Sequence, residues 1–192
     1  MEKDEKREKV LLASLKMFAK YGFKKTTVED IAGELGMTKG NLYLYAKDKK
    51  DLYNRSVAWA LLRWQGKVAE AVREESGAQA QFQVLCHKAV EYLTEDDHLR
   101  EILIHDPDIF PMFSDHDPYA DINNASVAMI QQILRLGIEE GVFRHVEVER
   151  IAEVIFSIYK MFIIRTYIRQ EGEKVHQMFE DTLELVMKGL LF

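Results

Sequence analysis

The distribution of proline constrains the fold of this chain more than any other feature of its sequence. The chain has 192 residues and only 3 prolines, Pro107, Pro111 and Pro118, all within one twelve-residue stretch. Because proline interrupts helices, every other part of the chain is free to form long ones. Apolar residues recur there at helical spacing, and no strand pattern is present. The sequence therefore predicts an all-α fold.

Glycines and N-capping residues set the expected helix boundaries. Gly22 and Gly36 end helices, Thr27 begins one with Asp30 as its capping-box partner, and Thr38 begins another. About nine helices are expected: residues 3–21, 28–35, 39–45, 49–75 and 79–94, a short helix ending near 105, residues 119–140 and 147–170, and a last helix after Gly172.

Charge is unevenly distributed along the chain. The net charge is −6, but residues 1–53 hold 12 Lys and Arg against 9 Asp and Glu, a balance of +3. A basic head on an acidic body indicates that a polyanion would meet the head. No apolar run has the length of a signal peptide or a membrane span, so a soluble, cytoplasmic protein is expected.

The single cysteine limits the possible chemistry. Cys86 alone forms no internal disulfide and no cysteine-rich zinc module. The adjacent Cys86 and His87 point to different parts of a helix, so no nucleophile–base pair and no enzyme activity is expected. No cofactor is expected either.

Residues 28–47 have the pattern of a helix-turn-helix. Two short helices that meet at a steep angle need a small residue at their contact, a glycine at the turn and apolar residues on both sides. Ala32 is the small residue and Gly36 the turn. The apolar supports are Ile31, Leu35, Met37 and Leu42.

The second helix of such a unit places its first residues at the base edges in the major groove. Those residues are Thr38, Lys39, Gly40 and Asn41. Lys39 suits a phosphate or guanine, Asn41 a base edge, and Gly40 a close approach of the backbone. Four further residues are expected at phosphates: Tyr43 and Tyr45 through their hydroxyls, and Thr27 and Lys49 at helix N-termini.

Residues 8–53 closely resemble the N-terminal domain of the TetR/AcrR family of regulators. The similarity is carried by Phe18-Ala19-Lys20-Tyr21-Gly22-Phe23, Thr27-Val28-Glu29-Asp30-Ile31-Ala32, Leu35-Gly36-Met37-Thr38-Lys39-Gly40-Asn41-Leu42-Tyr43 and Lys49-Lys50-Asp51-Leu52. The resemblance implies a dimer, a palindromic operator in double-stranded DNA, and repression relieved by a small ligand. One departure is Tyr45-Ala46, where the family commonly has two aromatic residues, so a core ring is missing.

The resemblance and the helix pattern together divide the chain into a helix-turn-helix domain, 1–48, and a helical effector-binding and dimerisation domain, 49–192. Helix 147–170 has two adjacent apolar stripes, more than one core covers, so one stripe is expected to face a second copy of the chain. Which stripe does so is left open. The residues assigned to the dimer interface are Ile151, Val154, Ile158, Phe162, Phe179, Leu183 and Val186.

Aromatic and methionine residues of the body predict an apolar pocket for a small apolar or aromatic effector. Its expected lining is Trp59, Leu62, Phe82, Cys86, His105, Phe110, Phe113, Met129, Ile133, Phe156 and Tyr159, with Tyr167 as a further polar anchor. Two alternatives remain: a regulator that has no small ligand, and a metal sensor that uses the histidines and aspartates of residues 98–117. Metal ligation needs three or four converging groups, which this spacing does not predict, so no metal ligand is assigned.

Overall fold

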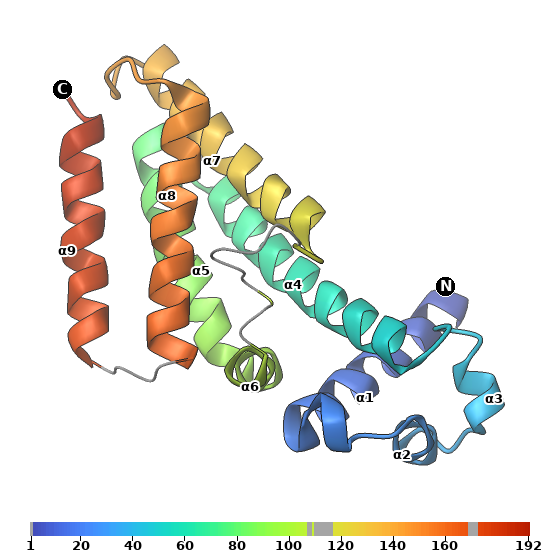
Figure 1. The fold of residues 1–192 in the computed structure, drawn as a ribbon. Coiled ribbons are helices and arrows are strands. Elements are labelled where there is room, and N and C mark those ends of the chain that lie inside the picture. Colours follow the sequence, from blue (N-terminus) through green and yellow to red (C-terminus); the bar gives the residue numbers. More distant parts are fainter. Residues whose placement is uncertain (1, 107–108, 110–116, 169–172) are drawn as a thin grey trace.

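The computed structural model describes residues 2–106, 109, 117–168 and 173–192, and in this part of the chain the structure is helical (Figure 1). Apart from one isolated bridge between Phe143 and Leu191, no strand pairing is present in these residues. The head contains α1 (Glu2–Lys25), α2 (Val28–Glu34) and α3 (Lys39–Leu42). The body contains α4 (Lys49–Glu74), α5 (Ala78–Glu95), α6 (Asp97–His105), α7 (Ala120–Glu139), α8 (Val148–Ile163) and α9 (Glu173–Leu190).

Most helix boundaries agree with the sequence pattern, and three do not. α1 runs to Lys25 rather than ending at residue 21, although Gly22 breaks its helical geometry with φ +77° where the sequence placed the end. α3 ends at Leu42 rather than near residue 45, and residues 43–45 form a turn. α8 ends at Ile163 and continues as a π-helical segment, Ile164–Ile168, where a single α-helix was expected. None of the described helices is long and apolar enough to cross a membrane.

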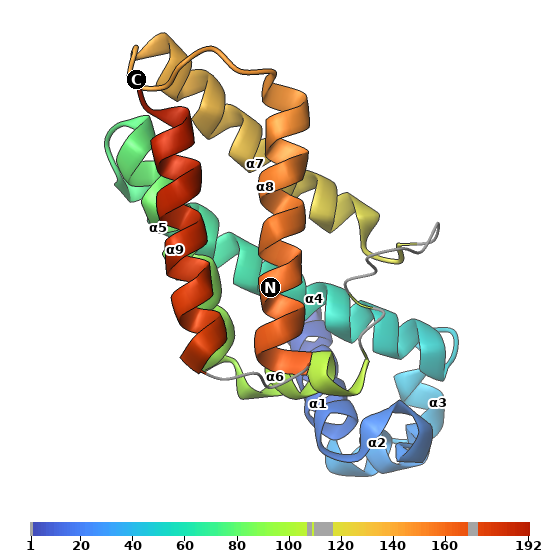
Figure 2. The same cartoon turned by 60° about the vertical axis from the view of Figure 1, so that its left-hand side comes forward.

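Figure 1 shows α4 running obliquely from the head into the body, while α8 and α9 stand side by side at the end of the body farthest from α3. After a turn of the view, α8 and α9 remain neighbours, and α6 lies next to α1 (Figure 2). The head is therefore attached to the body at two places, through the continuous helix α4 and through the contact of α6 with α1.

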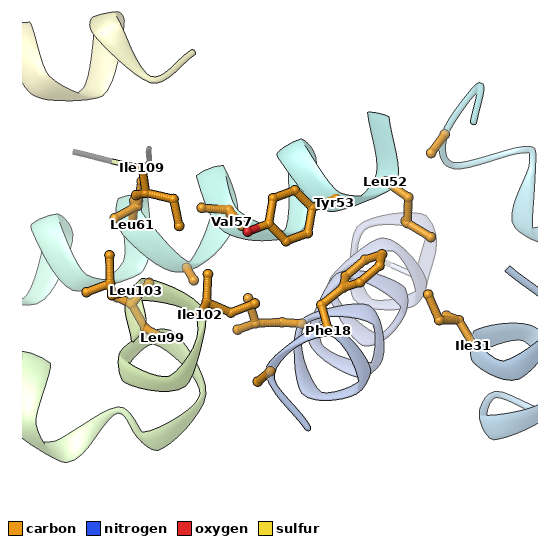
Figure 3. Packing of buried hydrophobic residues seen from close by; sticks show 14 of the residues in the cluster. Phe18, Ile31, Leu52, Tyr53, Val57, Leu61, Leu99, Ile102, Leu103 and Ile109 are labelled. Atoms are coloured by element: carbon orange, nitrogen blue, oxygen red, sulfur yellow. The ribbon is translucent and has the colours of Figure 1, made fainter. Parts of the chain in front are cut away.

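One hydrophobic cluster spans both attachments. Phe18 of α1 and Leu52 of α4 belong to the same cluster as Leu99, Ile102 and Leu103 of α6, and all five side chains are buried (Figure 3). α4 is the only covalent connection between head and body, but the packing of α6 on α1 makes a second, non-covalent one. A displacement of α6 must therefore move α1 as well.

A second cluster fills the body, and a glycine shapes its far end. Gly137, near the end of α7, accepts hydrogen bonds from the N–H groups of Val142 (3.0 Å) and Phe143 (2.9 Å). A Cβ atom at position 137 would lie 2.0 Å from the ring of Phe143, so only glycine lets this buried ring lie against the helix. This contact turns the chain from α7 toward α8.

Candidate DNA interface and internal cavity

The helix-turn-helix forms as its local sequence dictates. The Thr27 side chain accepts a hydrogen bond from the N–H of Asp30 (3.1 Å), and the Thr27 N–H donates to the Asp30 carboxylate (2.9 Å). This capping box, which the sequence predicted, fixes the first turn of α2. Gly36 has φ +62°, a left-handed conformation that favours glycine, and redirects the chain into α3. Ile31, Ala32 and Leu42 are buried where the helices meet.

The first residues of α3 are presented to solvent. Thr38 caps the helix by accepting a hydrogen bond from the N–H of Asn41 (3.2 Å). Thr38, Lys39, Gly40 and Asn41 are all exposed, and Leu42 points the other way into the core. The structure therefore brings the four residues expected at the base edges together on one free surface.

Lys39 is already engaged within the head. Its ammonium group forms an ion pair with Glu29 of α2 and lies 5.9 Å from the centre of the Tyr43 ring. The hydrogen bond from Lys39 lowers the pKa of the Glu29 carboxyl below its ordinary value, so Glu29 is charged at neutral pH. Both groups are exposed, and a DNA phosphate would compete with Glu29 for the lysine.

Tyr45 and Lys49, both expected to contact phosphates, are less accessible than Tyr43. Tyr43 is exposed, but Tyr45 is half-buried and packs against the hydrophobic cluster. The Lys49 ammonium group donates hydrogen bonds to the carbonyl oxygens of Phe23 (2.8 Å) and Thr26 (3.1 Å). Its side chain therefore closes the connection between α1 and α2, and only its backbone amide remains suited to the expected phosphate contact.

One exposed residue on this surface was not expected from the sequence. Leu44 is 81% exposed and lies in the turn that follows α3. Its exposure depends on the early end of α3, which the sequence pattern placed later. An apolar side chain here is suited to contact the methyl group of thymine in a major groove.

The ring missing at Ala46 leaves no exposed gap. Ala46 is itself buried. Close by in the same cluster, the ring of Tyr53 lies 5.1 Å from the rings of both Phe18 and Phe23, with edge-to-face contacts. Three aromatic rings from α1 and α4 thus hold the head on the body.

An internal cavity of about 70 Å³, part of it open to solvent, lies among α4, α5, α7 and α8. This volume is smaller than that of most small-molecule sites, so a ligand must widen the cavity as it binds. Four residues predicted for the pocket line it: Cys86, Met129, Phe156 and Tyr159. The sequence missed the rest of the lining, which is Leu61, Trp64, Gln65, Val68, Leu85, Ala89, Ile122, Asn123, Ser126, Ile130 and Ile155.

The other predictions for the cavity wall fail for the residues that the structure describes. Leu62 is 53% exposed, and the guanidinium of Arg63 covers the half-buried Trp59 ring at 4.5 Å, because α4 turns these residues away from the cavity. Phe82 and Ile133 are buried in the body's own core, and His105 is exposed beside α1. Phe110, Phe113 and the side chain of Tyr167 lie outside the described part of the chain.

The polar groups of the cavity wall are largely satisfied by the protein. The Trp64 indole N–H donates to the carbonyl oxygen of Ala89 (2.9 Å), and its ring stacks on Tyr159 at 6.3 Å. Gln65 Nε2 donates to the carbonyl oxygen of Ile122 and to Ser126 Oγ, both at 2.8 Å. Burial raises the pKa of the Cys86 thiol to about 12, so this wall residue is neutral.

The outer face of α8 and α9 is apolar in part. Val154 of α8 is 48% exposed, and Ile151 and Ile158 are half-buried and pack against the edge of the body's core. The opposite stripe, with Ala152, Phe156 and Ile163, is buried inside the chain. Leu183 and Val186 of α9 are half-buried, and Leu185, which the sequence analysis did not include, is exposed.

Two residues assigned to the dimer interface lie elsewhere. Phe162 is 3% exposed and Phe179 is 4% exposed, and their rings meet edge to face at 5.2 Å. They join α8 to α9 within one chain, because α9 covers the end of α8. The prediction that they face a partner is wrong.

Of the residues 98–117 considered for a metal, His98, His105, Asp106 and Asp117 are described. Among the described residues of the chain, no three His, Cys, Asp or Glu side chains converge as metal ligands would. Asp106 accepts a hydrogen bond from the Tyr53 hydroxyl (2.7 Å), and Asp117 accepts one from Asn123 (2.7 Å). Asp106 thus joins the end of α6 to α4, and Asp117 stabilises the first turn of α7.

The head matches a known family model. Residues 10–55 match the model described as bacterial regulatory proteins, tetR family. Residues 10–55 therefore form a DNA-binding domain of the TetR type. The TetR family consists of transcriptional regulators and not of enzymes. The TetR-type head covers the capping box, the turn at Gly36 and the exposed start of α3.

Curated relatives match only part of this chain. The uncharacterized HTH-type transcriptional regulators YerO and YfiR of Bacillus subtilis are 45% identical over 49 residues and 27% identical over 74 residues. These matches cover 26% and 38% of this chain, but only 17% and 36% of the relatives' own length. The function of the body does not follow from them.

Solved structures are similar over the whole TetR-type fold. A TetR regulator from Haloarcula marismortui has a TM-score of 0.82 at 19% identity, covering 98% of this chain and 100% of that one. The regulator FadR from Bacillus subtilis in complex with stearoyl-CoA has a TM-score of 0.75 at 19% identity, covering 94% and 97%. A regulator from Saccharomonospora viridis in complex with choline has a TM-score of 0.78 at 18% identity, covering 98% and 99%. At these identities the similarity concerns the fold alone.

Proposed function

We propose that this chain is a TetR-family regulator that binds a palindromic operator as a homodimer in the cytoplasm, represses transcription there, and is released by a small apolar effector. The observation that carries the proposal is the exposed start of α3, on a head that shares one hydrophobic cluster with α4 and α6 of the body. α3 enters the major groove, where Asn41 and Lys39 read base edges. Tyr43 and the N-termini of α2 and α4 contact phosphates and set the orientation.

The dimer forms through the outer face of α8 and α9. Val154 and Leu185 are exposed apolar side chains on this face, next to the half-buried Ile151, Ile158 and Val186. Burying such a face against a symmetry-related copy gives a four-helix contact that removes apolar area from water. The two heads then meet half-sites roughly 34–36 Å apart, one turn of DNA.

The dimer is tested by sedimentation. Val154→Asp places an unpaired charge at the centre of the proposed contact and is expected to give monomers with weaker operator binding. Glu153→Asp, on the same exposed helix surface, is the control and is expected to stay dimeric. A wild-type protein that sediments as a monomer at micromolar concentration would refute this part of the proposal.

The effector occupies the cavity among α4, α5, α7 and α8. The wall includes α4, which begins in the head, so a ligand that moves α4 or α6 changes the separation of the two α3 helices. Similar folds hold ligands as different as stearoyl-CoA and choline, so the fold by itself does not select the effector. An effector that releases DNA must bind the DNA-free form more tightly, typically by about 5–150-fold.

DNA reading is tested by selecting bound sequences from a random double-stranded library. Asn41→Ala is expected to change the selected sequence and to cost about 1–3 kcal/mol on the original site. The matched control is Asn124→Ala, which changes an exposed asparagine on α7 and should leave the selected sequence and the operator affinity unchanged. An unaltered selection with Asn41→Ala would contradict the assignment of α3 as the reading helix.

The class of effector is tested by a thermal-shift screen with apolar small molecules and with divalent metals. Stabilisation by apolar molecules, together with weaker operator binding in their presence, is the expected result. Stabilisation by metals alone would replace the effector part of the proposal with metal sensing. No stabilisation by either class would point to a regulator without a small ligand.

A further inference from the structure

Three polar side chains of the cavity wall, other than Trp64 and Tyr159, are gathered on one side. Gln65 of α4 and Ser126 of α7 are joined by a hydrogen bond of 2.8 Å, and Asn123 lies one turn before Ser126 on the same face of α7. The remaining wall toward α5 and α8 consists mainly of apolar side chains, among them Val68, Leu85 and Ile155. The cavity thus has one polar end, at the first turns of α7, and an apolar remainder.

The described wall of the cavity offers nothing to neutralise a charge. Of the fifteen side chains around it, none belongs to Asp, Glu, Lys, Arg or His. An ion moved from water into such surroundings loses its hydration and gains no partner, whereas a neutral group that finds a hydrogen bond loses little. A charge held inside this wall is therefore strongly disfavoured, whereas the cavity discriminates only weakly between neutral molecules.

Gln65 also bridges two helices. Both hydrogens of its amide nitrogen are directed to α7, one to the carbonyl oxygen of Ile122 and one to Ser126 Oγ. A ligand oxygen that accepts a hydrogen bond from Gln65 must take the place of one of these acceptors. Binding of an oxygen atom at this end therefore loosens α4 from α7, and α4 leads directly to the head.

We infer that the effector is a neutral molecule with an apolar body and one oxygen-bearing end, such as an alcohol, ketone or ester, and that this end binds Gln65. The inference rests on the proposed role of the cavity as the effector site. Gln65 is then both the polar anchor and the residue through which occupancy of the cavity weakens the contact of α4 with α7.

The test uses Trp64 as a reporter in the cavity wall. The chain has 2 tryptophans, so Trp59→Phe leaves Trp64 as the only one. Three probes of equal chain length are titrated at pH 8 below their micelle concentrations: decan-1-ol, decanoate and decyltrimethylammonium. Decan-1-ol is expected to change Trp64 emission saturably, and both ions are expected to bind at least about tenfold more weakly.

Gln65→Leu is measured against Gln132→Leu, an exposed glutamine on the outer side of α7. Loss of one hydrogen bond predicts about fivefold weaker decan-1-ol binding for Gln65→Leu, and a smaller effect of decan-1-ol on operator affinity. Gln132→Leu is expected to match the Trp59→Phe protein in decan-1-ol affinity and in the effect of decan-1-ol on operator affinity. Melting curves establish that each variant is folded.

The outcomes separate this inference from the function on which it rests. Equal binding of an ion and the alcohol would overturn the charge selectivity, and equal behaviour of the two glutamine variants would overturn the role of Gln65. Either result leaves the cavity as an effector site. If no probe changed Trp64 emission, the effector site and this inference would both fall, while sequence-selective DNA binding would still be measured independently.

Discussion

Replacing Tyr53 with phenylalanine removes one oxygen atom from the place where α4, α6 and α1 meet. The Tyr53 hydroxyl donates a 2.7 Å hydrogen bond to the carboxylate of Asp106, the residue that ends α6. Burial, and then the hydrogen bond to Asp106, raise the pKa of Tyr53 well above its ordinary value, so the hydroxyl stays a donor at all physiological pH. The phenylalanine ring keeps the edge-to-face contacts with Phe18 and Phe23.

The expected loss of stability is about 1 kcal/mol. Hydrogen bonds to charged groups contribute about 1.5–3 kcal/mol when the partner is left buried and unsatisfied. Asp106 is half-exposed, so water solvates its carboxylate in the variant, and the loss falls below this range, near the ~1 kcal/mol of an ordinary hydrogen bond. For a chain of this length such a loss lowers the melting temperature by about 2–4 °C.

The functional effect is measured as the linkage between decan-1-ol binding and operator binding, that is, the factor by which decan-1-ol weakens operator affinity. If α6 carries the effect of the cavity to α1, Tyr53→Phe should reduce the factor by which decan-1-ol weakens operator binding, while the affinity of the cavity for decan-1-ol changes little. Tyr92→Phe is the control, because this half-buried ring on α5 contacts Lys67 and Lys88 rather than the head. An unchanged melting temperature and an unchanged linkage factor for Tyr53→Phe would refute the argument that this hydrogen bond couples α6 to the head.

Three further predictions follow from single contacts. Glu29→Gln frees Lys39 and removes a negative charge beside the DNA phosphates, so operator affinity and its salt dependence should both rise in binding titrations; unchanged values would mean that Lys39 does not contact DNA. Gly137→Ala forces the buried Phe143 ring to move and should destabilise the chain by about 1–3 kcal/mol or more in denaturant titrations, and a neutral effect would contradict the close contact. The pKa of Cys86 is raised from 9.0 to about 12 in the folded chain, so this thiol contributes stability below pH 9 that is lost as the pH rises toward 12. At pH 8 the thiol should react with thiol reagents only as the chain unfolds. Rapid labelling of the native protein would disprove its burial.

The sequence by itself determined the local structure of the head. The capping box of Thr27 and Asp30, the Thr38 cap and the turn at Gly36 each depend on residues within five positions of one another. Such contacts form wherever the chain has these residues in this order, whatever the rest of the molecule does. The all-α fold and most helix boundaries follow for the same reason, since periodicity and helix-breaking residues are also local.

Only the tertiary structure decided what the helices present to one another. Phe162 has the same spacing along α8 as Ile158 and Val154, yet it is buried because α9 covers it. Lys49 lies at a helix start like many phosphate-binding residues, yet its side chain is held by the carbonyl oxygens of Phe23 and Thr26.

The cavity is the clearest case of this difference. Its polar end joins Gln65 to residues 57 and 61 positions later in the chain, and its ring pair joins α4 to α8. Sequence periodicity gives the apolar face of each helix but not the rotation and distance at which two such faces meet. These depend on the packing of all side chains between the helices at once, so Trp64 could be placed in the wall and Leu62 outside it only from the assembled fold.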